Sequence, residues 1–464
     1  MVGMMIIGYV VGKINIKGSA DYLVAGRRMG LFMVAFSLSA NNIGGGSTTG
    51  LAQKAFGAWG ISAIWYVLAA SLAMIPLAYF APKIRKTMAV TIPEVVGRRF
   101  GKLSSNFTAV LSVLSLFCLT SSQIGASGAV INALIPSIPL NVCLLLAGFV
   151  TIFYTTFGGM IADQVSDLIQ FGIILVGLAI ATPIVLKYAG GWQAISAALP
   201  GEKLNMTQIG WASIIGYFFN YFCGPEMVSR FETCKDEKTA VRASFLCAIL
   251  MAAMSIFPTL LGLAAFALKD QLPGLAENGS NAMMVVTGAY APGVVTGLIS
   301  AAIICATMSS ADSNLLCMST MIINDIYPGF GGKKKLDDKQ TIFYTRLCNV
   351  IAALIAMGIS MFGVSLVAMN TFAFGIRCAG PFAAYGLGLA VPKATKNSGM
   401  ISIFTGTIAF VVWQLLSNGG TLWFMMPVVF GSLVSVITFY AVNLIEWKRG
   451  VPAAPSAYAV EEAK

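Results

Sequence analysis

The sequence contains no histidine and few charged residues. Asp, Glu, Lys and Arg make up 10% of its 464 residues, whereas a soluble domain carries about 25%. Without histidine the chain lacks the commonest metal ligand and proton relay at neutral pH. The nine cysteines are scattered and show no metal-ligand spacing, which indicates packing rather than zinc binding. These absences exclude a zinc enzyme or a His-based catalyst.

Apolar residues dominate what remains. They form 57% of the chain, and the mean hydropathy is +0.82. About thirteen apolar stretches approach the roughly 20 residues that a membrane helix needs. We therefore expect an all-α polytopic membrane protein with about thirteen transmembrane helices. The stretches centre near residues 7, 43, 69, 119, 149, 174, 217, 256, 309, 355, 380, 408 and 434.

The net charge of +11 is distributed unevenly along the chain. If alternate loops are assigned to the inside, 24 of the 29 Lys and Arg residues fall on that side and Arg377 lies within a span. This is the positive-inside pattern of a protein in a lipid bilayer, so no nucleic-acid partner is needed to explain the charge. It predicts a multi-pass protein of the bacterial or archaeal plasma membrane, with the N-terminus outside and the C-terminus cytoplasmic.

The apolar pattern also predicts four regions. Residues 1–20 would form a short first membrane helix, because Met1–Val11 is too short to cross: either that helix is shortened or the true start lies upstream. Residues 21–395 would form the transport core, 396–449 two further membrane helices, and 450–464 a disordered cytoplasmic tail rich in Ala and Pro.

Two polar interruptions lie inside otherwise apolar stretches. The first contains Asn41, Asn42 and three glycines, Gly44–Gly46, and the second is Cys223-Gly-Pro225. Glycine disfavours a helix and lets a ligand approach the main chain, so unwound carbonyls there can bind a cation; a close helix contact is the alternative. The breaks open two blocks of five spans, about 30–188 and 208–392, which begin on opposite sides. We therefore expect a 5+5 inverted repeat.

A third polar stretch supplies hard oxygen ligands. Ala306, Ser309, Ser310 and Ser313 recur at helical spacing and share one face, with Asp312 nearby. Serine hydroxyls often bond back to their own helix, which explains each serine singly but does not explain Asp312.

These stretches resemble the sodium:solute symporter family, which includes sodium-coupled sugar, proline, pantothenate, choline and sialic acid carriers. The resemblance covers about residues 20–395 and implies a leucine-transporter-type core of ten helices, with one helix before it and two after. It rests on Ser39-Ala-Asn-Asn-Ile-Gly44, Gly158-Gly-Met-Ile-Ala-Asp-Gln-Val-Ser-Asp-Leu-Ile-Gln170, Gly224-Pro-Glu-Met-Val-Ser-Arg-Phe231, and Met308-Ser-Ser-Ala-Asp-Ser-Asn314 followed by Asn324-Asp-Ile-Tyr327.

The resemblance also implies the ligands of the coupling ion. A principal sodium would bind the main-chain carbonyls of Ala40, Ile43 and Ala306 and the hydroxyls of Ser309 and Ser310. A second sodium, present in some members, would use Ser309 again, together with Asp167, Asp312 and Ser313. Some relatives have Ser where this chain has Asp312, which leaves the occupancy of that site open. Asp163 is expected nearer the cytoplasmic end of its helix and receives no role.

The family's solute pocket lies between the first broken helix and four other core helices. Matching positions here are Asn42, Gly45, Trp65, Gln123, Tyr217, Asn220 and Phe374, although ordinary packing also explains the aromatic ones. Arg377 lies mid-span, where a guanidinium needs a partner. That partner is either a substrate carboxylate or an internal acid, Asp312, Asp167 or Glu226.

These features predict a monomeric sodium-coupled importer of a small organic solute that works by alternating access, with a carboxylate or amino acid favoured. The alternative is a proton-coupled or passive carrier of a neutral or cationic solute such as a sugar or choline. A sensor is disfavoured because the 14-residue tail is too short for a kinase, and an enzyme because no nucleophile–base pair is present.

Overall fold

The structure, a computed structural model, describes residues 2–135, 137–206, 211–329, 336–362, 366–418, 420, 422 and 425–458. Within these ranges the chain is helical and contains no β-strand. In the first part, helices and short 3₁₀ turns are α1 (Val2–Asn15), α2 (Ser19–Val24), η1 (Ala25–Arg27), α3 (Leu31–Asn42), η2 (Gly45–Ser47), α4 (Thr49–Phe56), η3 (Gly60–Ile64), α5 (Trp65–Lys86), α6 (Ile92–Phe100), α7 (Lys102–Leu134) and α8 (Leu140–Tyr188).

The second part continues with long helices joined by short ones, and here η5 and η6 are π-helical turns. Its elements are α9 (Gly191–Ala198), α10 (Gly201–Leu204), α11 (Trp211–Phe222), α12 (Pro225–Thr233), α13 (Glu237–Ala267), η4 (Lys269–Gln271), α14 (Ala282–Tyr290), α15 (Gly293–Met321), η5 (Ile322–Ile326), α16 (Tyr327–Gly329), α17 (Asp338–Met361), α18 (Leu366–Cys378), η6 (Ala383–Leu387), α19 (Gly388–Ala390), α20 (Lys396–Leu416) and α21 (Pro427–Lys448).

Eight helices among the described residues are long and apolar enough to cross a membrane. The sequence predicts about thirteen spans, and the difference has a local cause. The two predicted breaks divide their spans into α3 with α4 and α11 with α12, so that no single helix there reaches spanning length. Two further apolar helical segments, Gly3–Asn15 of α1 and Leu140–Phe153 at the start of α8, are shorter than a span. The chain is therefore a multi-pass membrane protein whose core contains interrupted helices.

Helix α8 contains a sharp change of direction at Gly159, whose φ of +57° is unfavourable for any residue with a side chain. A Cβ at this position would lie 2.7 Å from Tyr22 Cδ2, so the glycine also permits α2 to pack closely. Beyond the bend, the second half of α8 carries Asp163 and Asp167 into the molecule, where both are buried.

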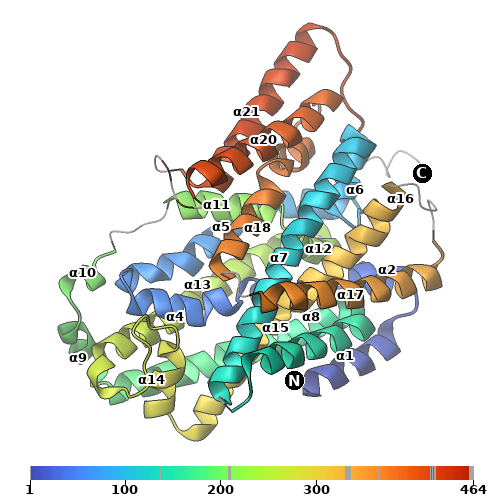
Figure 1. Cartoon of the computed structure of the whole chain (residues 1–464). Helices are drawn as coiled ribbons and strands as arrows, with labels where there is room; N and C mark the ends of the chain where they lie inside the picture. Colours follow the sequence, from blue (N-terminus) through green and yellow to red (C-terminus); the bar gives the residue numbers. More distant parts are fainter. Residues whose placement is uncertain are drawn as a thin grey trace.

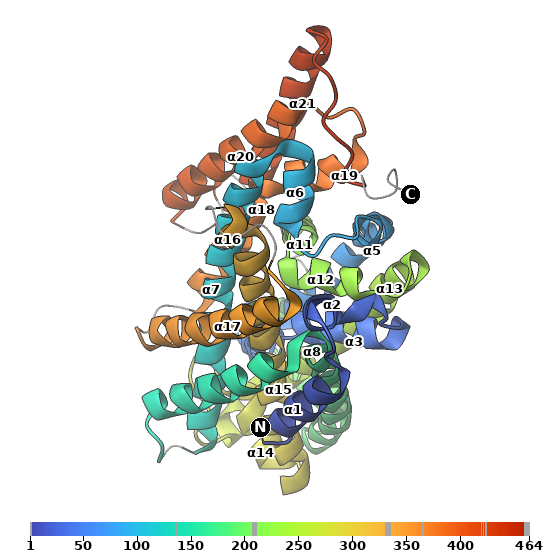
Figure 2. The ribbon, with the colours of Figure 1, turned by 90° about the vertical axis from the view of Figure 1, so that its right-hand side faces the viewer.

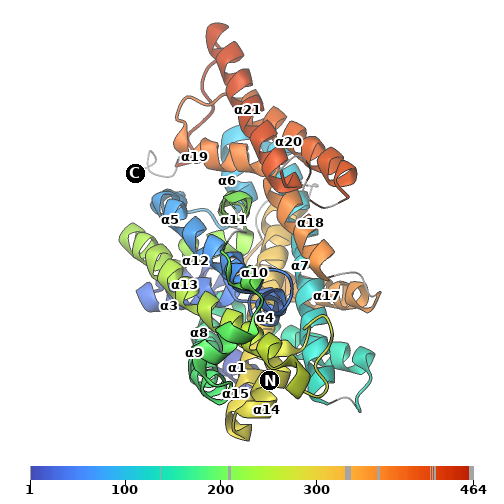
Figure 3. The same cartoon turned by 90° about the vertical axis from the view of Figure 1, so that its left-hand side faces the viewer.

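Several short helices lie at two opposite ends of the molecule. In Figure 1, α9, α10 and α14 lie at the lower left, whereas α2, α6 and α16 lie at the right with the C-terminus. Figure 2 looks onto the second end and Figure 3 onto the first. The lysines at the first end include Lys187 and Lys203, and the second end carries Arg27, Arg85 and Arg98.

Helices α20 and α21 form a pair at the top of all three views. Part of the segment after α21 packs against the core: the Ala454 N–H donates to the Ala394 carbonyl at 2.7 Å, and Tyr458 Oη donates to the Leu389 carbonyl at 3.2 Å. Ala454 and Tyr458 of the expected disordered tail are therefore held against α19 and the segment that joins it to α20, and residues 459–464 lie outside the described residues.

Candidate functional site

The first helix break lies where the sequence predicts it. Helix α3 ends at Asn42, and Ile43 has φ −97° and ψ 71°, which is not helical. The carbonyls released by the break are partly satisfied by nearby hydroxyls, since Thr48 Oγ1 donates to the Gly44 carbonyl at 3.1 Å and Ser47 Oγ to the Asn42 carbonyl at 3.0 Å. The backbone therefore unwinds without leaving all of its polar groups unpaired in an apolar setting.

Oxygen atoms of α3 and α15 converge beside this break. Ser309 Oγ lies 3.1 Å from the Ala40 carbonyl oxygen and 3.2 Å from that of Ala306. Ser310 Oγ lies 3.1 Å from the Asn41 carbonyl oxygen and 3.4 Å from that of Ala306. All of these residues are buried. The donor set contains only oxygen, which suits a hard monovalent cation, and we call these five residues the oxygen cage.

Four of the five ligands predicted for the principal sodium thus lie together: Ala40, Ala306, Ser309 and Ser310. Ile43 is buried next to them and donates its N–H to the Ala40 carbonyl at 3.2 Å, and its own carbonyl remains a predicted ligand. The Asn41 carbonyl contacts Ser310 although sequence reasoning assigned it no role. Helical spacing could have included it, because Asn41 follows Ala40 in the same terminal turn.

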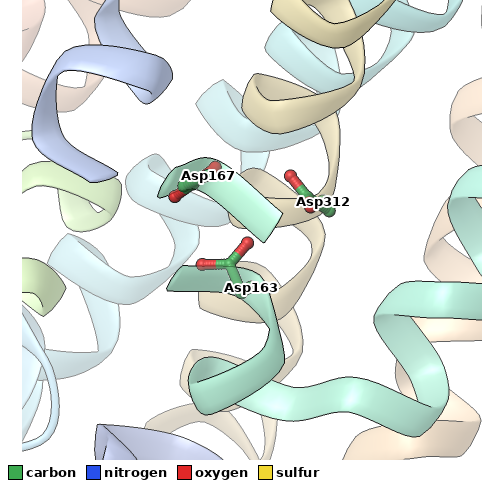
Figure 4. Close-up of side chains that lie close together, drawn as sticks. All are labelled: Asp163, Asp167 and Asp312. Atoms are coloured by element: carbon green, nitrogen blue, oxygen red, sulfur yellow. The ribbon is translucent and has the colours of Figure 1, made fainter. Parts of the chain in front are cut away.

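A cluster of three buried carboxylates lies one turn further along α15. Oxygens of Asp163 and Asp167 on α8 and of Asp312 on α15 are all within 4.8 Å of one another, and Figure 4 shows the three side chains close together. Ser313 Oγ is 3.1 Å from Asp163 Oδ1, and its N–H donates to Asp312 Oδ1 at 2.8 Å. The residues predicted for a second sodium, Asp167, Asp312 and Ser313, therefore do meet.

Arg230 of α12 forms ion pairs with two members of this acidic cluster. Its Nη2 lies 2.5 Å from Asp163 Oδ2 and 3.1 Å from Asp167 Oδ2, and it also donates to Ser313 Oγ. The Arg230 side chain has no exposed surface. Ser37 of α3 bridges the pair, accepting from Arg230 Nε at 3.1 Å and donating to Asp167 Oδ2 at 2.5 Å. The cluster is thus a charge-assisted network across α3, α8, α12 and α15.

Two charged members of this network were missed by sequence reasoning, as was Ser37. Asp163 was expected near a helix end and without a role, but it is 4% exposed and bonded to Arg230. Arg230 belongs to the 24 basic residues predicted on the cytoplasmic side, yet it lies inside the protein. The available signal was the i, i+4 spacing of Asp163 and Asp167, which places both carboxylates on one helix face and requires a cation opposite them.

The second helix break carries another buried ion pair. Arg377 Nη1 lies 2.7 Å from Glu226 Oε2, and Arg377 Nε donates to Asn220 Oδ1 at 2.8 Å. The guanidinium also lies over the Phe374 ring, 5.3 Å from its centroid. Of the partners weighed from the sequence, Glu226 is therefore the internal acid that contacts Arg377. Two donors stay unmatched among the described residues: Arg377 Nη2 and Asn220 Nδ2 are buried without a hydrogen-bond partner.

The other solute candidates surround the first break. A Cβ on Gly44 would lie 3.2 Å from Gln123 Oε1, and a Cβ on Gly46 would lie 3.1 Å from Tyr66 Oη. Tyr66 in turn meets Tyr217 edge to face, with 6.0 Å between ring centroids. Gly45 faces Thr307, Asn42 Nδ2 donates to the Leu38 carbonyl at 2.9 Å, and Trp65 Nε1 is buried without a partner among the described residues.

A cavity opens on the end that carries α2 and α16. It has a volume of about 330 Å³, and Ser19, Arg27, Asn324 and Thr345 are among the residues that line it. A smaller cavity of about 10 Å³ continues inward, shares Leu23, Val90 and Thr320 with the larger one, and is also lined by Ser229. Ser229 Oγ accepts from Arg230 Nη1 at 3.2 Å. The smaller cavity therefore lies between Ser229, which contacts the acidic cluster through Arg230, and the larger cavity at this end.

Comparison with known proteins agrees with this geometry. Residues 22–406 match the sequence model of the Sodium:solute symporter family. A sodium/proline symporter of Staphylococcus aureus (strain bovine RF122 / ET3-1) is 26% identical over 471 residues, covering 96% of this chain and 91% of that protein. A second Staphylococcus aureus sodium/proline symporter is 26% identical over 455 residues, covering 93% and 88%.

Solved structures share the fold. A Na⁺-coupled sialic acid symporter in a substrate-bound outward-open state has a TM-score of 0.83 and 21% identity, covering 98% of this chain and 97% of that one. Mhp1, a nucleobase-cation-symport-1 family transporter in a closed conformation, has a TM-score of 0.60 and 16% identity, covering 96% and 98%. At these identities the similarity concerns the arrangement of the helices.

Proposed function

Because the chain belongs to the sodium:solute symporter family, it is a sodium-coupled symporter and not an enzyme, and we propose that it imports a small carboxylate or amino acid by alternating access. The observation that supports this proposal most strongly is the oxygen cage, in which Ser309 of α15 meets the Ala40 carbonyl of α3 at 3.1 Å. A cation bound there would tie the broken helix to α15, so its arrival and departure would change how these two helices pack.

Coupling to sodium makes such import concentrative. A sodium ion that moves inward gains about 2.3 kcal/mol per 100 mV of membrane potential, in addition to its own concentration gradient. At about 1.36 kcal/mol per factor of ten, each coupled ion can support roughly 50-fold accumulation per 100 mV of a solute that carries no net charge, such as a zwitterionic amino acid. The cavity beside α2 and α16 would then be the route by which sodium and solute leave toward the cytoplasm.

The solute class is supported by the relatives and by one charged group. The similar proteins are named as symporters of proline and of sialic acid, and both of these solutes carry a carboxylate. In this chain the unmatched Arg377 Nη2 and Asn220 Nδ2 offer donors for such a group. We propose that Asn42, Gly45, Trp65, Gln123, Tyr217 and Phe374 form the rest of the solute pocket.

A second sodium at Asp167, Asp312 and Ser313 is part of the proposal. In this conformation Arg230 already provides a positive charge next to Asp167 Oδ2. Asp167 Oδ1, in contrast, is buried without a hydrogen-bond partner among the described residues. A second ion would therefore bind on the Oδ1 side, between α8 and α15, and Arg230 would compete with it for the same carboxylates.

The finer architecture is proposed on the same basis. If α3 with α4, and α11 with α12, each count as one span, and α8 as two separated at Gly159, the helices fit thirteen spans with a 5+5 inverted repeat over residues 21–395. We further propose a monomer with an external N-terminus and a cytoplasmic C-terminus. The basic residues near α2, α5 and α6 support that orientation in the plasma membrane.

Thermal unfolding of the purified protein tests the function. A solute that binds the folded state raises the melting temperature by mass action. We expect sodium chloride, but not potassium chloride at equal ionic strength, to allow stabilisation by an amino acid or short carboxylate. Sugars, nucleobases and choline serve as competing classes. Stabilisation by every effective solute to the same extent in potassium would contradict sodium coupling, and stabilisation only by a sugar or choline would contradict the solute class.

A further inference from the structure

The ion pair between Arg377 and Glu226 is electrically neutral, yet it does not use all of its binding groups. Arg377 is 1% exposed and Glu226 is 6% exposed, so both charges are withdrawn from water. A buried charged pair is stable when its remaining donors and acceptors are also matched. Here Arg377 Nη2 and Asn220 Nδ2 have no hydrogen-bond partner among the described residues, so the site has two spare donors.

The orientation of Asn220 follows from its neighbour. Arg377 Nε carries a hydrogen and can only donate, so the Asn220 amide must present its oxygen to it, as the 2.8 Å contact shows. The Asn220 amide nitrogen is therefore a fixed donor on the other side of the group. A guanidinium N–H and an amide N–H that both lack acceptors form the donor set that a carboxylate would complete.

Gly224 lies close to both charges of the pair. A Cβ built on this residue would lie 3.0 Å from Glu226 Oε1 and 3.2 Å from Arg377 Nη2. The atoms that do not take part in the 2.7 Å contact between Nη1 and Oε2 therefore flank the same point at the helix break. This point lies between α11 and α12, in the part of the chain where the solute pocket is proposed.

We propose that Arg377, Glu226 and Asn220 form a dipolar docking site for a zwitterionic amino acid, with Arg377 Nη2 and Asn220 Nδ2 binding the solute carboxylate and Glu226 Oε1 binding its ammonium. This inference rests on the proposed function and narrows its solute from a carboxylate or amino acid to an amino acid that carries both charges. Glu226 becomes a specificity-determining residue, since it supplies the acceptor that a solute without an ammonium group cannot use.

Because the Arg377–Glu226 pair carries no net charge, it favours a zwitterionic solute over a solute that carries only a carboxylate or only an ammonium group. A simple carboxylate bound at Arg377 would also face the Glu226 carboxylate, and in a site of low dielectric that repulsion is strong. A simple amine would meet the guanidinium in the same way. A zwitterion matches each charge with its opposite and leaves the net charge of the site unchanged.

Matched solutes test this inference in the purified full chain. The twenty amino acids are screened by thermal shift in sodium chloride, and the best one is compared with its analogue without the amino group and its analogue without the carboxylate; for proline these are cyclopentanecarboxylate and pyrrolidine. We expect the apparent affinity to fall at least 100-fold for each analogue. An equal or tighter affinity for the analogue without the amino group would overturn the proposal, as would stabilisation only by another solute class.

Three variants distinguish solute recognition by the ion pair from a purely structural role in joining α12 to α18. Glu226→Gln should weaken binding of the amino acid at least 10-fold and invert the solute preference in favour of the deaminated analogue. Arg377→Gln should instead shift the solute preference toward the amine. The double variant Glu226→Gln/Arg377→Gln has no buried unpaired charge and should bind neither analogue preferentially. If all three solutes weaken equally in Glu226→Gln, the pair only holds α12 to α18 and the proposal fails.

The thermal shift produced by sodium without any solute tests the proposed function independently of the docking site. Stabilisation by sodium through the oxygen cage should persist in the double variant, because the cage lies on α3 and α15 and contains neither Glu226 nor Arg377. If the wild type shows no sodium-specific shift, the proposed function fails. If the sodium-specific shift is present but no amino acid binds more tightly than its own single-charge analogues, the docking site is wrong and the proposed function stands.

Discussion

Arg230 and Asp163 are 67 residues apart in the sequence, yet their side chains form a 2.5 Å ion pair from which water is excluded. Arg230 extends from α12, directly after the second break, and Asp163 from α8, directly after the bend at Gly159. The second broken helix and the bent helix α8 thus contribute one charge each. The pair connects the second broken helix to the helix that also carries Asp167, next to the oxygen cage.

Removal of the Arg230 charge should destabilise the protein strongly. Arg230→Gln leaves two buried carboxylates without their guanidinium, and the loss of one partner of a buried pair costs about 3–5 kcal/mol. We expect a large fall in melting temperature, partly reversed in Asp163→Asn/Arg230→Gln because one uncompensated charge is removed. Arg242→Gln, at an exposed arginine of α13, is the matched control and should change little. An unchanged melting temperature in Arg230→Gln would show that the network contributes nothing to stability.

The oxygen cage predicts which serine determines sodium affinity. Ser309→Ala removes a hydroxyl that lies within 3.2 Å of two carbonyl oxygens, and we expect sodium affinity to fall at least tenfold, which corresponds to about 1.4 kcal/mol. Sodium titration of the thermal shift measures this. Ser319→Ala on the same helix also removes a buried hydroxyl, bonded to Asn349, and should leave sodium affinity intact. Equal effects of the two substitutions would contradict the cage.

The first break requires glycine at position 44 because two side chains pack closely against its Cα. A Cβ on Gly44 would lie 3.2 Å from Ser310 Oγ and from Gln123 Oε1, which is tighter than ordinary contact, so Gly44→Ala should push Ser310 away from the cage and weaken sodium binding. Gly172→Ala in α8 meets nothing within 4 Å. That control should be neutral or stabilise by up to about 1 kcal/mol, because Ala is the better helix former. Unaltered sodium binding in Gly44→Ala would rule out this steric role.

Orientation can be tested by labelling from each side of the membrane. Asn324→Cys lies in the 330 Å³ cavity, and Glu202→Cys lies in α10 at the opposite end. In a background where the half-buried Cys118 and Cys348 are replaced by Ser, we expect an impermeant thiol reagent to label position 324 only in inside-out vesicles and position 202 only in right-side-out ones. The reverse pattern would invert the topology derived from the basic residues.

The start of α13 should respond to pH through its capping residue. Asp236 accepts a hydrogen bond from the Thr239 N–H at 2.7 Å, and this bond holds the pKa of Asp236 below its usual value. Because the folded pKa is lowered, the cap stabilises the helix above the unfolded pKa of about 3.9, and its contribution is lost as the pH falls through the folded value. The protection of the Thr239 amide against hydrogen exchange, relative to its intrinsic exchange rate at each pH, should therefore fall on acidification.

The variant Asp236→Asn keeps an acceptor at the cap and removes the titration. Its exchange rate at Thr239, corrected for intrinsic chemistry, should not depend on pH over the same range. If the protection of the Thr239 amide falls to the same extent in both proteins, the effect comes from general acid unfolding and not from the cap.

Local features of the chain were predictable because they depend on neighbours in the sequence. The glycines at 44–46 and the Cys223-Gly-Pro225 motif predict the two breaks, and the spacing of Ser309, Ser310 and Ser313 places them on one face. Arg377 could be recognised as a buried charge that needs a partner, but three acids in the sequence could have provided it. The choice of Glu226 depends on how α12 and α18 pack, which no local pattern specifies.

The sequence by itself determined that this is an all-helical membrane protein with interrupted helices and a serine-rich helix face, because hydropathy, glycine content and helical period act over a few turns. Only the tertiary structure decided which polar and charged groups meet. Arg230 pairs with Asp163 and Asp167, Arg377 pairs with Glu226, and the Ala40 carbonyl meets the Ser309 hydroxyl. Burial makes every such charge require a partner, but the identity of the partner depends on contacts between helices far apart in the chain.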